Sequence, residues 1–170
     1  MSEHTKITKG YLILASLFVV WLVICNIIFV DIFKIHDTWP AFFICIFFFA
    51  YELKMERLKE IFIGATSGLI IGFTIPICLD FLSNFLPFIV AFNLYLGVVL
   101  FIIIGTKPVA HTYLNPTTFT YALMCLISFQ NGIVIKDQIF GWTATMLLGG
   151  ALLIVGLVAV IKVLTRTTQK

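Results

Sequence analysis

The sequence is poor in charge. Of its 170 residues, 11% are Asp, Glu, Lys or Arg and 61% are hydrophobic, whereas soluble domains carry about 25% charged residues. A soluble chain of this length keeps a large share of its residues at the surface, where so much apolar area would meet water. The composition therefore excludes an ordinary globular domain and predicts that a lipid bilayer surrounds most of the chain.

The sequence also lacks the patterns of a catalytic or metal site. The cysteines lie in apolar runs without CxxC spacing, and the loop histidines have no ligand partners nearby. No Ser/His, Cys/His or paired carboxylate arrangement is present, and the net charge of +3 is spread over several short segments. We therefore expect no enzyme activity, metal, cofactor or nucleic-acid partner. The residues concerned are Cys25, Cys45, Cys78, Cys125, His36 and His111.

Long apolar runs take the place of these missing features. A helix crosses the hydrocarbon layer with roughly 20 apolar residues, and no alternating strand pattern competes with helices here. The sequence predicts an all-α, polytopic membrane protein, with a single transmembrane domain over residues 1–170 that contains six transmembrane helices. The predicted spans are 11–30, 39–53, 61–79, 85–105, 116–129 and 139–161.

Lys and Arg are distributed unevenly about these spans. Nine of the 11 basic residues fall on one side, and only Lys34 and Lys136 fall on the other. Cytoplasmic loops carry the excess of Lys and Arg. This split predicts a multi-pass protein with both termini in the cytoplasm.

An internal repeat is suggested by the two short spans, which each start beside a proline. Residues 40–72 match residues 116–149 when Pro40 pairs with Pro116, Gly64 with Gly141 and Gly72 with Gly149. The repeats would cover about 11–80 and 83–164. Because each holds three spans, the second would enter the membrane from the opposite face. Paired short or interrupted segments in such 3+3 inverted repeats indicate a translocation site.

Polar and aromatic residues near these helix starts are the candidates for lining a pore or contacting a solute. Asn115 has an alternative role as a helix N-cap, the threonines are alternatively bonded to their own helix, and the aromatic residues are alternatively interface anchors. The candidates are Trp39, Pro40, Phe43, Thr66, Asn115, Pro116, Thr117, Thr118, Thr120 and Thr143.

Small residues at four-residue spacing lie on the third and sixth predicted spans. Such spacing lets membrane helices approach closely. We expect a helix-packing role, with pore lining as the alternative, for Gly64, Gly68, Gly72, Gly141 and Gly149.

Most of the chain from Thr38 onward resembles the YcdZ-type domain-of-unknown-function family of bacterial inner-membrane proteins. The resemblance lies in TWPAFF, in FFFAYELKMERLKEIFIGATSGLIIG and in LNPTTFTYALMCLISFQNGIVIKDQIFGWTATMLLGG. It implies a bacterial inner-membrane location and a transport role. The segment from Asn115-Pro116 to Gln130-Asn131 is also similar to the Asn-Pro segment of urea transporters, although Thr118 and Phe119 stand where a glycine is usual.

These observations favour a small-solute channel or facilitator that works as a homo-oligomer. No ionisable residue lies at the centre of a predicted span, which disfavours ion-coupled pumping. The solute class is an uncharged polar molecule or a small anion. Two alternatives stay open: the substrate-binding membrane subunit of a vitamin importer, and a scaffold protein that transports nothing.

Overall fold

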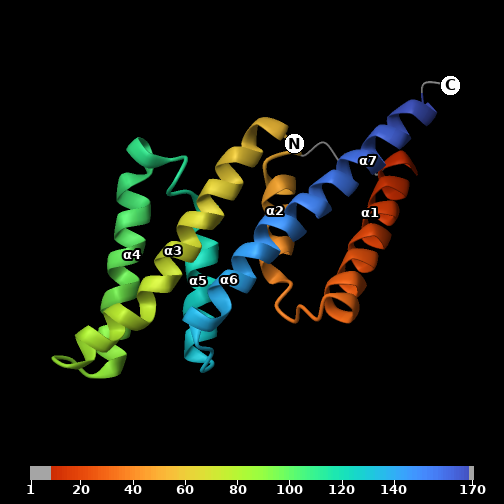
Figure 1. The fold of residues 1–170 in the computed structure, drawn as a ribbon. Helices are drawn as coiled ribbons and strands as arrows, with labels where there is room; N and C mark the ends of the chain where they lie inside the picture. Colours follow the sequence, from red (N-terminus) through yellow and green to blue (C-terminus); the bar gives the residue numbers. More distant parts are fainter. Residues whose placement is uncertain (1–8, 169–170) are drawn as a thin grey trace.

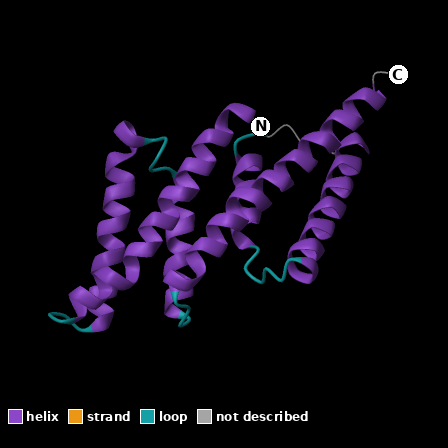
Figure 2. Ribbon diagram, viewed as in Figure 1, coloured by secondary structure: helices purple, strands orange, loops and turns teal. Residues whose placement is uncertain are grey.

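The computed structural model describes residues 9–168, and every regular element in that range is helical (Figure 2). Lys6 and Lys170, which enter the charge count above, lie outside the described residues. In chain order the elements are α1 (Lys9–Ile27), η1 (Ile28–Ile32), α2 (Trp39–Ala50), η2 (Met55–Arg57), α3 (Leu58–Ser83), α4 (Phe88–Ala110), α5 (Pro116–Gln130), α6 (Ile135–Ala144), η3 (Thr145–Gly149) and α7 (Gly150–Thr168).

Four helical stretches are long and apolar enough to cross a membrane. They are Ala15–Ile32, Met55–Ser83, Phe88–Thr106 and Ile135–Lys162. The other two helices are shorter: α2 has 12 residues and α5 has 15. At 1.5 Å per residue they extend about 18 Å and about 22 Å, short of the roughly 30 Å hydrocarbon layer. By length and composition, the described residues include four candidate membrane-spanning helices, and the six spans and the inverted repeat stay predictions.

The two short helices start from opposite ends of the molecule (Figure 1). The α1–α2 connection lies at the bottom of the view, away from the start of α1 and the end of α7, whereas the α4–α5 connection lies at the top. Because they start from opposite ends, α2 and α5 run in opposite directions. Pro40 and Pro116 both lie in the first turn of their helices, where the missing proline N–H removes no helical hydrogen bond.

Each short helix packs along a long one. Helix α5 lies along α3, and α2 lies along η3 and α7. The remaining helices flank this centre, since α4 packs on α3 and α1 packs on α7. The buried side chains form one apolar cluster that includes Ile44, Phe48, Ile61 and Leu153. The short helices therefore occupy the interior, and the flanking helices α1 and α4 present largely exposed apolar faces.

Glycines allow the closest helix approaches. A Cβ on Gly68 would lie 2.5 Å from the carbonyl oxygen of Thr118 in helix α5. Gly72 lies against Cys125 of the same helix, and Gly64 lies against Asn115, the N-cap of that helix. These three positions pack as the four-residue spacing predicts.

The glycines of the second long helix that contact α2 are not the ones that the repeat alignment predicts. Gly149 lies against Ala41, and Gly150 lies against Ile44. Gly141, which the alignment pairs with Gly64, is exposed and a Cβ there would have no neighbour within 4 Å. No helix packs on Gly141 within the described chain, because α2 crosses the long helix about two turns later.

Candidate functional site

The start of α2 meets the second turn of α5 through an aromatic cluster. Tyr121 of α5 donates a hydrogen bond to the carbonyl of Pro40 in α2. The ring of Trp39 lies 5.4 Å from the Tyr121 ring and 5.3 Å from that of Trp142, and Phe43 lies 6.1 Å from Tyr121. Tyr121 and Trp142 are almost fully buried. Three of the predicted residues, Trp39, Pro40 and Phe43, therefore lie together where the short helices cross.

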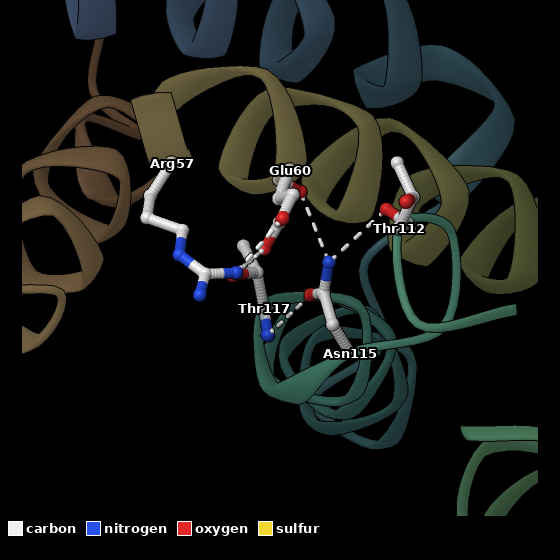
Figure 3. A network of polar contacts seen from close by, with 5 residues as sticks. All are labelled: Arg57, Glu60, Thr112, Asn115 and Thr117. Carbon is white, nitrogen blue, oxygen red and sulfur yellow. Dashed lines mark hydrogen bonds and ion pairs between the residues drawn. The ribbon is translucent and has the colours of Figure 1, made fainter. Parts of the chain in front are cut away.

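Asn115 caps α5 and also ties it to α3. Its side-chain oxygen accepts from the backbone N–H groups of Thr117 and Thr118 at 2.9 and 3.2 Å. Its amide nitrogen donates to the carbonyls of Glu60 at 3.0 Å and Thr112 at 3.2 Å (Figure 3). The Thr118 hydroxyl accepts from the Asn115 N–H at 3.2 Å, which completes a capping box. Asn115 is thus the N-cap that the sequence offered as the alternative to a pore residue.

An ion pair lies at the start of α3, beside this cap. Arg57 donates from one nitrogen to both carboxylate oxygens of Glu60, at 2.9 and 2.8 Å (Figure 3). Its guanidinium also lies 5.9 Å from the centre of the Tyr51 ring. Thr117, the next predicted residue, is fully buried, and its hydroxyl oxygen has no hydrogen-bond partner among the described residues. Pro116 is exposed at the helix start.

The remaining predicted threonines do not come together. Thr66, Thr120 and Thr143 lie on different helices, and each hydroxyl donates to the carbonyl four residues earlier at 2.7 to 3.0 Å. Such local bonds occupy the hydroxyl hydrogen. These side chains therefore form no continuous polar path in the structure.

A cavity of about 700 Å³ lies beside the aromatic cluster, between the α1–α2 connection and the long helix formed by α6, η3 and α7. It is half open. None of the ten residues predicted to line a pore borders it, but Gly141 and Gly149 do. Its polar lining residues are Lys34, His36, Asp37, Gln138 and Thr145. We call this space the outer cavity, because the α1–α2 connection that borders it lies at the opposite end of the molecule from the start of α1 and the end of α7 (Figure 1).

Both π-helical turns of the described chain border the outer cavity. Phe29 belongs to η1, and Thr145 and Gly149 belong to η3. The Phe29 ring lies against Gly149, so the two π-helical turns contact each other beside the cavity. π turns inside helices occur frequently at functional sites.

One hydrogen bond joins the outer cavity to the aromatic cluster. The indole N–H of Trp142 donates to a carboxylate oxygen of Asp37 at 2.9 Å. Trp142 borders the cavity on one side and contacts Trp39 on the other. Sequence reasoning missed this arrangement. The available signal was the group of charged residues between the first two apolar runs, among them Lys34, His36 and Asp37.

Comparisons with known proteins do not extend this picture. No protein family, curated protein or solved structure matches this chain. The chemistry of the site therefore rests on its own residues. Among the residues from 9 to 168, no three His, Cys, Asp or Glu side chains lie together in a group able to hold a metal ion. The site offers aromatic surface, amide and hydroxyl groups, and two opposite charges.

Proposed function

We propose that the chain is a membrane facilitator for a small, uncharged polar solute or a small anion, built from two three-helix halves of opposite orientation. Each half contributes one flanking helix, one short helix and one long helix. The packing supports two equivalent halves, because the long helix of each half packs on the flanking and short helices of the other. Helix α3 lies against α4 and α5, and α7 lies against α1 and α2. In this proposal all six helices contribute to the crossing, and both chain ends lie in the cytoplasm of a bacterial cell.

The observation that carries the proposal is the contact between the proline-led start of α2 and the second turn of α5. The hydrogen bond from Tyr121 to the Pro40 carbonyl joins the first turn of α2 to α5 inside the protein. In inverted-repeat transporters, interrupted helices of the two halves form the substrate site near the middle of the membrane. The outer cavity would be the entrance to that crossing, and the aromatic cluster would be its closed constriction.

The buried polar side chains favour facilitation over ion coupling. Those of the described residues are Asn115, Thr117, Thr118, Ser128 and Thr145, and none of them is ionisable. Proton- and ion-coupled transporters usually keep an ionisable side chain at membrane depth. The exposed apolar faces of α1 and α4 are available to lipid or to a second copy of the chain, in keeping with the homo-oligomer that we expect.

Removing the Phe43 ring tests the constriction. Phe43 is half-buried and contacts Trp39 and Tyr121, so Phe43→Ala opens space in the aromatic cluster while the hydrogen bond to Pro40 is kept. We expect a several-fold faster swelling of proteoliposomes in gradients of small neutral solutes than with the unchanged protein. The measurement is stopped-flow light scattering over a series of solute sizes.

The matched control is Phe101→Ala. Phe101 is 78% exposed on α4, away from the cluster, so its removal leaves the constriction unchanged. Equal swelling rates for Phe43→Ala, Phe101→Ala and protein-free vesicles, with both variants folded, would contradict a pathway through the aromatic cluster.

A further inference from the structure

The outer cavity carries two opposite charges that do not neutralise one another. Lys34 and Asp37 both line it. Among the residues that the structure describes, neither Lys34 nor Asp37 takes part in an ion pair. Asp37 accepts a hydrogen bond from the indole N–H of Trp142, a neutral donor that brings no positive charge to the carboxylate. Each charge can therefore interact with a ligand or with water.

The positions of these two charges are set by the backbone and by packing. Lys34 has a φ of 56°, a left-handed conformation at the start of the connection between η1 and α2. Asp37 is held by Trp142, which is only 1% exposed. The amide of Gln138 adds a neutral donor and acceptor to the same lining. A ligand meets polar groups of both signs along this edge of the cavity.

The rest of the cavity is apolar. Its walls include Phe29, Phe33, Ile35, Leu148 and Leu152. At about 30 Å³ for each water-sized group, the cavity has room for a ligand of up to roughly 20 non-hydrogen atoms. A solute of a few polar atoms would fill little of this volume and would leave the aromatic walls in contact with water.

We propose that the outer cavity binds a zwitterionic solute with a large apolar group, such as an α-amino acid with an aromatic or aliphatic side chain. Its carboxylate would lie at Lys34, its ammonium group at Asp37, and its apolar group against the phenylalanine walls. Such a solute carries two charges but no net charge, so this inference rests on the proposed function and extends its solute class from uncharged molecules to net-neutral ones.

Charge pairing gives the reason for preferring a zwitterion. A ligand with one charge would satisfy one of the two cavity charges and leave the other facing apolar ligand surface, which is unfavourable unless that charge stays in water. A zwitterion satisfies both with charge-assisted hydrogen bonds, which are stronger than neutral ones. The apolar group contributes through the surface that it removes from water.

Three ligands of the same skeleton test the proposal. Phenylalanine, 3-phenylpropanoate and 2-phenylethylamine are titrated into the full chain in detergent micelles, with binding measured by isothermal titration calorimetry. We expect phenylalanine to bind at least several-fold more tightly than either of the other two. Lys34→Gln should remove its advantage over the amine, and Asp37→Asn should remove its advantage over the carboxylate.

The matched controls are Lys136→Gln and Asp31→Asn. Both residues are exposed and neither lines the outer cavity, so these variants lose the same charges elsewhere and should bind phenylalanine like the unchanged protein. Equal affinity for all three ligands, no detectable binding, or an equal loss in the cavity and control variants would overturn the inference. This assay measures no flux, so its failure is distinguishable from failure of the proposed transport, which the swelling experiment tests independently.

Discussion

Gly68→Leu is expected to separate α5 from α3 and to give the largest loss of stability of any substitution considered. Even a Cβ at this position would lie 2.5 Å from both the Thr118 carbonyl oxygen and the Cβ of Tyr121. The Thr118 oxygen belongs to the backbone, so the whole helix must shift. Overpacking by single methylenes costs about 1–3 kcal/mol. Leucine adds four carbons, and we expect a loss above about 3 kcal/mol, measured as the free energy of unfolding in mixed micelles.

Gly97→Leu is the matched control for this substitution. Gly97 lies inside α4, where a Cβ would have no neighbour within 4 Å. Leucine has a better helix propensity than glycine by about 0.8 kcal/mol, so this variant should be at least as stable as the unchanged protein. If Gly68→Leu unfolds at the same denaturant concentration as Gly97→Leu, the close contact between α3 and α5 is not present in the protein.

The second large effect is expected for Asn115→Ala. This change leaves two backbone N–H groups of α5 and the carbonyls of Glu60 and Thr112 without their side-chain partner. Loss of an N-cap costs about 0.5–2 kcal/mol, and loss of the two hydrogen bonds from the side-chain amide adds about 1 kcal/mol each. Asn115 is only 6% exposed, so water cannot readily replace it. We expect a total loss of about 2–4 kcal/mol in the same unfolding measurement.

Two further variants separate the roles of this side chain. Asn115→Asp keeps the acceptor for the helix N–H groups and loses the donor to α3, so its stability should lie between those of the alanine variant and the unchanged protein. Asn131→Ala removes an exposed asparagine from the other end of α5 and should have little effect. Equal losses for Asn115→Ala and Asn131→Ala would show that the cap does not hold α5 on α3.

The sequence predicted the helices well because long apolar runs between charged residues leave the chain few other conformations. The starts of α2 and α5 were predicted to the residue, since Pro40 and Pro116 mark them. The start of α6 was not, because Lys136 and Asp137 had the appearance of a loop but lie in the first turn of a helix. An acidic residue there interacts favourably with the helix dipole.

The candidate site was only partly predictable. Trp39, Pro40 and Phe43 were selected from their position beside a proline, and they do lie where the short helices meet. The outer cavity was missed because its walls depend on tertiary contacts. The π turn at Thr145–Gly149 lies where Phe29, more than 100 residues earlier, packs against Gly149. No local pattern in a single sequence encodes such a contact.

The length of α2 has a consequence for how far water reaches into the protein. A helix of about 18 Å falls about 12 Å short of the usual hydrocarbon thickness, and the connection before it carries Lys34, His36 and Asp37. The long flanking helices α1 and α4, rather than α2, present exposed apolar faces to lipid, so the bilayer keeps its thickness around them. The polar connection before α2 should therefore lie below the level of the surrounding headgroups, with water beside it.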